Sequence, residues 1–128
     1  MTRYAEKTKV PVARSRDEIE RVLSRYGADA FGYGWDSGRS VISFRAQGRY
    51  IRFAMDVPAQ AQEERQRWRA LLLVIKAKLE AVESGITTFE EEFLAHVVLP
   101  DNRTVSEWLL PQVENAYLEG GMPKQLMP

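Results

Sequence analysis

The sequence predicts an α+β fold: an N-terminal helix, a three-stranded antiparallel meander packed on a long helix, and a helical C-terminal region. Apolar and polar residues alternate with a period of two in three successive segments between residues 30 and 57. A helical period then runs through residues 59–84 without an interior glycine or proline. Short turns join the three segments, which favours antiparallel pairing, and the long helix can cover one face of the resulting sheet.

The composition is that of one globular domain. The chain has 128 residues, of which 45% are hydrophobic and 28% are charged. We find no linker and no internal repeat, so we expect a single domain spanning residues 1–128. The chain has no cysteine, which excludes disulfides and thiolate metal sites, and no apolar run of membrane-spanning length. We therefore expect a cytoplasmic protein without membrane association.

The segment before the meander predicts one helix. Residues 8–12 alternate in polarity and fit a short edge strand, because the proline among them forbids a central one. Ser15 and Glu18 then have the spacing of a capping box, and apolar residues follow at helical spacing. Gly27 provides a C-cap. The expected helix is about 16–26.

Three strands are expected at 30–35, 39–45 and 50–57. The sequences Asp36–Gly38 and Gln47–Gly48 between them are typical of tight turns. The third segment has the most regular alternation and ends at a proline. These features predict two hairpins in sequence.

Aromatic residues alternate with glycine in the first expected strand, and two interpretations remain open. If the rings face the long helix, they belong to the core. If the glycines instead let that helix approach closely, the rings point outward as a binding platform. The residues are Phe31, Tyr33 and Trp35.

After the long helix, which Gly85 ends, the sequence predicts shorter helices. Thr88 and the glutamate three residues later form a capping-box pattern. Residues 97–105 fit a small hairpin, but Thr104 equally fits the N-cap of a further helix. Pro111 is expected to break or kink that helix, or to begin a new one. Its apolar face continues to a pair of glycines through Val113, Ala116 and Tyr117.

The net charge of zero hides a division between the two parts of the chain. Residues 1–78 carry 16 Lys and Arg against 9 Asp and Glu, or +7, whereas residues 79–128 carry 2 against 9, or −7. One interpretation is that the two parts neutralise each other within the fold or between subunits. The other is a basic face that binds a polyanion.

The sequence gives little support to catalysis. His96 is the only histidine, and neither a nucleophile elbow nor a phosphate-binding glycine loop is present. Glu92 and His96 have a spacing that can hold a metal on a helix. The acidic run at Glu90–Glu92 is better explained as charge that complements a helix N-terminus. We expect no enzymatic activity, no cofactor and no metal site.

Basic residues offer a candidate nucleic-acid interface. On the sheet face opposite the core, arginines accompany a tyrosine, and such a surface suits single-stranded nucleic acid; the same arginines can equally keep an exposed face soluble. A basic stripe on the long helix can follow a phosphate backbone or pair with the acidic C-terminal part. The expected nucleic-acid-binding residues are Arg39, Arg45, Tyr50, Arg52, Arg65, Arg69 and Lys76.

Several short stretches resemble a family of small accessory proteins encoded in phages and prophages. They are Arg25–Ala28, Arg67–Leu71, Ile75–Glu80, Glu92–Leu94 and Gly121–Pro123. The resemblance implies an accessory gene product in the host cytoplasm and brings no activity or site residue with it. The order helix, three strands, helix is also that of a double-stranded-RNA-binding domain, although the basic residues do not form that domain's motif.

Two functional hypotheses follow. The leading one is a non-enzymatic phage or prophage accessory protein that binds nucleic acid through the basic sheet face and the basic helix. The alternative is a protein-interaction module, either an inhibitor of a host system or a homodimer in which a basic face meets an acidic one. The partners considered are therefore nucleic acid, a host protein and a second copy of the chain.

Overall fold

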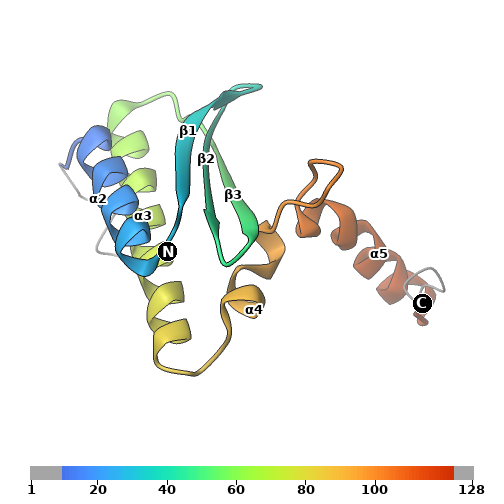
Figure 1. Ribbon diagram of the computed structural model, residues 1–128. Coiled ribbons are helices and arrows are strands. Elements are labelled where there is room, and N and C mark those ends of the chain that lie inside the picture. The colour runs from blue at the N-terminus through green and yellow to red at the C-terminus, as the bar shows by residue number, and fades with distance from the viewer. Residues whose placement is uncertain (1–9, 123–128) are drawn as a thin grey trace.

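The computed structural model describes residues 10–122 and has the expected α+β architecture. Helices α2 and α3 lie side by side against one face of the sheet, while α5 extends away from the rest of the molecule (Figure 1). Within the described residues, no helix combines the length and the apolar character that crossing a membrane requires. The elements are α2 (Val12–Tyr26), β1 (Ala30–Asp36), β2 (Arg39–Ala46), β3 (Arg49–Asp56), α3 (Ala61–Glu83), α4 (Phe89–Phe93), the 3-10 helix η1 (Leu94–His96) and α5 (Val105–Glu119).

The three strands form an antiparallel sheet in the order β1-β2-β3, which confirms the predicted meander. Both hairpins have two-residue turns in which each residue has positive φ: 53° and 78° at Ser37 and Gly38, and 51° and 75° at Gln47 and Gly48. This geometry matches the right-handed twist of the paired strands. The two predicted turns are therefore confirmed.

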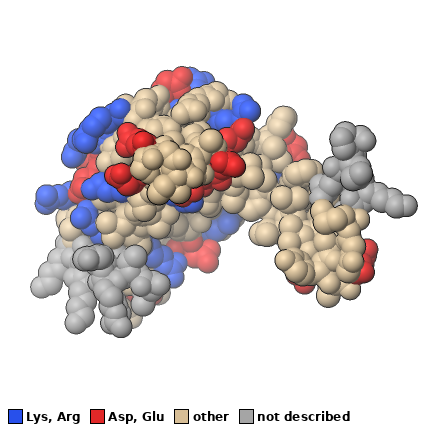
Figure 2. Space-filling model, turned by 90° about the horizontal axis from the view of Figure 1, so that it is seen from below, with Lys and Arg blue, Asp and Glu red and all other residues tan. Residues whose placement is uncertain are grey.

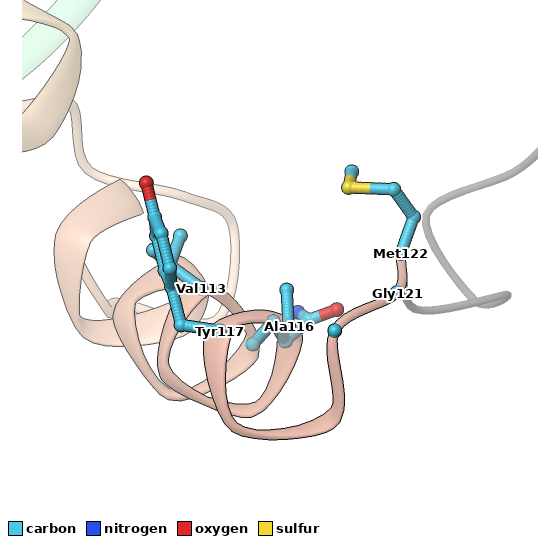
Figure 3. Close-up of a pocket in the computed structure, with 7 residues that line it drawn as sticks. Val113, Ala116, Tyr117, Gly121 and Met122 are labelled. Atoms are coloured by element: carbon cyan, nitrogen blue, oxygen red, sulfur yellow. The ribbon is translucent and has the colours of Figure 1, made fainter.

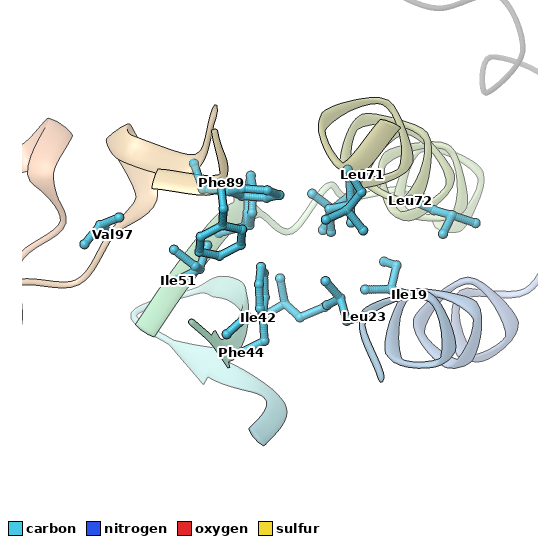
Figure 4. Close-up of a cluster of buried hydrophobic side chains, with 14 of the residues drawn as sticks. Ile19, Leu23, Ile42, Phe44, Ile51, Leu71, Leu72, Phe89 and Val97 are labelled. Carbon is cyan, nitrogen blue, oxygen red and sulfur yellow. The ribbon is translucent and has the colours of Figure 1, made fainter. Parts of the chain in front are cut away.

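The core lies between the sheet and helices α2, α3 and α4 (Figure 4). Aromatic rings meet around Phe93, which is fully buried: its ring lies 5.8 Å from that of Phe44, nearly perpendicular to it, and 4.9 Å from that of Phe89. Full burial of one such side chain contributes about 1.5–3 kcal/mol. The other buried core residues include Ile19, Leu23, Ile42, Ile51, Trp68, Leu72 and Ile75.

Helix α2 begins earlier than expected. It starts at Val12 after Pro11, whose extended backbone serves as the N-cap, and Ser15 is buried inside the helix without any capping bond. Proline suits the start of a helix because the missing N–H is not needed there. The capping-box prediction at Ser15 was therefore wrong. Of the edge strand expected at 8–12, residues 8 and 9 lie outside the described part, and residues 10–12 form no strand.

The connection to α5 combines the two alternatives left open by the sequence. Val98 forms a β-bridge with Thr104, as in a small hairpin, and Thr104 also caps α5 by a capping box with Glu107. The predicted capping box at Thr88 is likewise confirmed. Pro111 neither breaks α5 nor starts a new helix, because the helix is continuous through it. The backbone carbonyl that loses its partner there belongs to an exposed helix, where water can bind it.

Candidate interaction surfaces

One face of the sheet lies opposite the helices of the core, and only the turn before α5 and the first residues of α5 adjoin it. We call it the open face; it consists of Arg39, Val41, Ser43 and Arg45 of β2 with their cross-strand neighbours on β1 and β3. Its centre is built from small side chains. An added Cβ at Gly32 or Gly34 would meet nothing within 4 Å. The open face is therefore a shallow surface that leaves room for an approaching partner.

Arg45 contacts the aromatic residue of the open face. Its guanidinium carbon lies 5.4 Å from the ring centroid of Tyr50, and its Nη1 donates to the tyrosine hydroxyl at 3.0 Å. The Nε of Arg45 donates to Asp29 at 2.8 Å, and this bond lowers the pKa of the aspartate. The Arg45 guanidinium and the Tyr50 ring thus lie together on the open face. The carboxylate of Asp29 already occupies one of the guanidinium's donors.

Arg52 joins the open face to the base of α5. Its Nη2 donates to the Asn102 carbonyl oxygen at 2.7 Å and lies 3.5 Å from a carboxylate oxygen of Glu107. The pKa of Glu107 is lowered mainly by the hydrogen bond from the Thr104 backbone, then by the Thr104 hydroxyl and the nearby positive charge of Arg52. The capping carboxylate of α5 is thus also the partner of a sheet arginine.

A polar hollow of about 420 Å³ lies where the open face meets the start of α5. Two arginines and two carboxylates line it, so it has no net positive charge to attract an anion. The side chain of Arg39 is exposed and makes no hydrogen bond to a described residue, but its positive charge helps to lower the pKa of Glu107. The principal polar lining residues are Asp36, Arg39, Arg52, Thr104, Ser106 and Glu107.

The seven predicted nucleic-acid-binding residues divide between two separate surfaces. Arg39, Arg45, Tyr50 and Arg52 lie on the open face. The other three belong to α3, which packs on the opposite side of the sheet (Figure 1). The structure therefore does not bring the sheet residues and the helix residues into one patch. The helix residues are Arg65, Arg69 and Lys76.

One positive charge of the basic helix is neutralised by a neighbouring carboxylate, and a second arginine is held by a neutral amide. Arg69 pairs with Glu18 of α2 at 3.2 Å, and Arg65 donates to Gln62 at 2.6 Å, whereas Lys76 is exposed. Glu18 therefore contributes to helix packing and not to an N-terminal cap. Only part of the stripe remains available to an external phosphate.

Ion pairs also connect the basic and acidic parts of the chain, which supports the neutralisation interpretation. They are Arg49–Glu90 at 2.6 Å, Arg52–Glu107 at 3.5 Å and Lys78–Glu92 at 3.8 Å. On the main body, blue and red side chains are interspersed in Figure 2, and they form no extended basic area on the face shown. These three pairs place part of the acidic charge of residues 79–128 against basic side chains of residues 1–78.

Helix α5 is the most exposed element with an apolar surface. None of its residues, all within the described part, is buried, and the exposed fractions of Leu110 and Tyr117 are 61% and 86%. Val113, Tyr117 and Met122 border an apolar hollow of about 470 Å³ (Figure 3). The sequence indicated the apolar face of α5, but the structure leaves that face without a partner among the described residues. The sequence alone therefore missed this surface as a site.

The aromatic triplet fits neither of the two interpretations completely. Cross-strand pairing places Phe31, Tyr33 and Trp35 on the helix-covered side of the sheet, and Phe31 packs against the core. Tyr33 and Trp35 are nonetheless exposed. Arg16 of α2 lies over the Tyr33 ring, with its guanidinium carbon 4.0 Å from the centroid. The end of β1 that contains Tyr33 and Trp35 is thus, besides α5, a second surface with exposed aromatic rings.

Glu92 and His96, the pair considered for a metal, contact other residues. The His96 ring stacks on Phe53 at 4.0 Å, and Glu92 pairs with Lys78. Burial, helped by the positive charge of Lys78, lowers the pKa of His96. Among the residues that the structure describes, no group of three or more His, Asp or Glu side chains could hold a metal ion.

The phage and prophage resemblance remains a prediction from short stretches of sequence. Comparison with protein-family models, with curated proteins and with solved structures finds no match to this chain.

Proposed function

We propose that this chain is a non-enzymatic protein-interaction module whose binding element is α5. The observation that carries the proposal is that α5 leaves the main body with an apolar face and no buried residue in its described length. Exposed apolar patches of this kind commonly mark interaction surfaces. The phage or prophage setting is part of the proposal and rests on the sequence resemblance.

The apolar side chains of α5 are spaced for recognition by a groove or flat surface. Leu110, Val113 and Tyr117 follow the three-four spacing that places anchors on one side of a helix. The base of α5 is held by the capping box and by Arg52, so the helix is presented in a defined orientation. Such preorganisation lowers the entropy lost on binding.

The charge of α5 favours a protein over a nucleic acid as its partner. The helix carries Glu107, Glu114 and Glu119 and contains no lysine or arginine. Phosphate groups would be repelled by this surface, whereas a protein surface with arginine or lysine donors around an apolar centre would complement it.

Site-specific photo-crosslinking in the producing cell tests the proposal. A benzophenone amino acid in place of Tyr117 should form covalent adducts with protein. The same amino acid in place of Glu20, which is exposed on α2, should form few. Leu110→Ser should reduce the adducts at position 117 without unfolding the chain, as circular dichroism would verify. Equal labelling from the two positions, or none from position 117, would contradict the proposal.

Nucleic-acid binding is the second candidate, because the guanidinium of Arg45 and the ring of Tyr50 form a platform on the open face. Fluorescence anisotropy with labelled single- and double-stranded DNA and RNA tests it. Binding should weaken steeply with added salt. Arg39→Gln and Tyr50→Ala should reduce it, while Lys76→Gln on the opposite helix layer serves as the control. Absence of salt-sensitive binding to all four nucleic acids would rule out this candidate.

A further inference from the structure

The apolar face of α5 and the open face of the sheet are complementary surfaces of one chain. We propose that α5 binds the open face of a second copy, and that two copies do so reciprocally around a twofold axis. This inference rests on the proposed function and names the partner of α5. Each open face then receives one helix, and the assembly closes as a dimer.

The shape of the open face suits a helix. Gly32, Gly34 and Ala54 leave open space beside Val41, and Arg52 is the one large side chain in the two inner rows of this face; an added Cβ at either glycine would meet no atom within 4 Å. Larger side chains of α5, such as Leu110 and Tyr117, can fill the space that these residues leave. A sheet with one face covered by α2 and α3 would then be covered by helices on both faces.

The lengths of the two surfaces also agree. Helix α5 has 15 residues and is therefore about 22 Å long at 1.5 Å per residue. Strand β2, at the centre of the sheet, has 8 residues and is about 27 Å long at 3.4 Å per residue. One α5 can thus lie along most of one open face.

Hydrogen-bonding groups on the two surfaces are complementary. Helix α5 offers the carboxylates of Glu114 and Glu119 and no basic side chain. The side chain of Arg39 on the open face is exposed and makes no hydrogen bond to a described residue, although Asp36 and Asp56 are its cross-strand neighbours. A polyanion needs a net positive field, which the paired arginines do not supply. One carboxylate of the helix, at Glu114 or Glu119, can accept a hydrogen bond from the guanidinium of Arg39, which no described side chain holds.

The attachment of α5 directs it towards another molecule. Arg52 holds the turn before α5 at the side of its own sheet, and the helix then leads away from that sheet (Figure 1). Folding α5 back onto its own open face would require breaking the Arg52 contacts and the Thr104 cap. A second copy can meet the helix without this loss.

The absence of cysteine from the chain allows a direct crosslinking test. Ala54→Cys places a thiol on the open face, and Val113→Cys places one on the exposed face of α5. Mixing the two single variants under mild oxidation should give a disulfide-linked dimer, and the wild-type chain should sediment as a dimer. Glu20→Cys mixed with Val113→Cys is the matched control and should crosslink only at background level.

Several results would overturn the inference. They are a wild-type chain that stays monomeric at high concentration, a Val113→Cys variant that crosslinks equally well alone, and an intrachain disulfide in a chain that carries both Ala54→Cys and Val113→Cys. If an oligonucleotide prevents the crosslinking, the open face binds nucleic acid, and the inference is overturned as well. If position 117 still photo-crosslinks to another protein while the cysteines do not react, the inference fails and the proposed function stands. If position 117 labels no protein, both fail.

Discussion

The guanidinium of Arg52 and the backbone carbonyl oxygen of Asn102 lie 2.7 Å apart, and this hydrogen bond joins the sheet to the turn from which α5 begins. The same arginine lies 3.5 Å from Glu107, the capping residue of α5. The direction in which α5 presents its apolar face therefore depends on contacts made by one side chain of β3.

Replacing Arg52 by leucine should loosen the base of α5 with little effect on global stability. The ion pair with Glu107 is partly exposed, and pairs of this kind contribute only about 0–1 kcal/mol. Amide hydrogen exchange in residues 101–108 should accelerate, whereas exchange in α3 should not change. Arg49→Leu is the control, since Arg49 pairs with Glu90 of α4 and not with a residue of 101–108. Similar acceleration in both variants would contradict the assigned role.

Phe93→Ala should be among the most destabilising single substitutions. The ring is fully buried and contacts the rings of Phe44, Phe53 and Phe89, so its removal leaves a cavity in the aromatic centre of the core. Truncations of this kind cost about 3–5 kcal/mol, a large part of the stability of a small domain. Urea denaturation followed by circular dichroism measures the loss.

Trp35→Ala is the matched control for the core substitution. The Trp35 side chain is 84% exposed, although a tryptophan in a strand commonly packs in a core. The change should alter the free energy of unfolding by no more than about 0.5 kcal/mol. A large loss would show that Trp35 is covered in solution, and it would place an interface at the outer end of β1.

The parts of the fold that local patterns determine were predictable. Alternation predicted the three strands, and the turns at residues 37–38 and 47–48 have the positive φ that their sequences favour. The start of α2 was not predictable in this way, because Ser15 matches a capping box and yet lies in a buried position of the helix. Tertiary packing of the first turn of α2 outweighed the local signal.

The candidate site was predictable only in part. Alternation correctly placed Arg39, Arg45 and Arg52 on the uncovered side of the sheet. It could not show that Asp29 and Glu107 would meet two of these arginines, because those contacts join residues far apart in the sequence. Nor does helical periodicity say whether an apolar face is covered, and in α5 it is not covered by any described residue.

The C-cap of α2 predicts a contrast between two glycines. Gly27 has φ of 117° and donates its N–H to the carbonyl oxygen of Leu23 at 3.1 Å, a conformation that alanine adopts only with strain. Gly27→Ala should therefore lower the free energy of unfolding by about 1 kcal/mol or more. Gly32→Ala, in an open strand position, should be nearly neutral. Equal effects of the two substitutions would contradict this account.

His96 should make stability depend on pH in the mildly acidic range. Burial and the charge of Lys78 lower its pKa below the ordinary value of 6.5, while a hydrogen bond with the Arg52 backbone partly opposes them. The unfolded chain therefore binds the proton more readily than the folded chain. The neutral His96 ring therefore contributes to the free energy of unfolding. This contribution is complete above about pH 6.5, the ordinary pKa of histidine, and it is lost as the pH falls through the lower pKa that His96 has in the folded chain.

Two measurements check this prediction. His96 is the only histidine, so its ring protons give a single, unambiguous titration by nuclear magnetic resonance, and the midpoint should lie below 6.5. Urea midpoints should fall between about pH 7 and pH 5.5, and this fall should be smaller in His96→Phe, which keeps a ring against Phe53 but cannot be protonated. The carboxylates with lowered pKa, such as Glu107, act at lower pH because their ordinary value is 4.5. A midpoint at or above 6.5, or equal pH dependence in both proteins, would show that the folded state does not disfavour the charged imidazole.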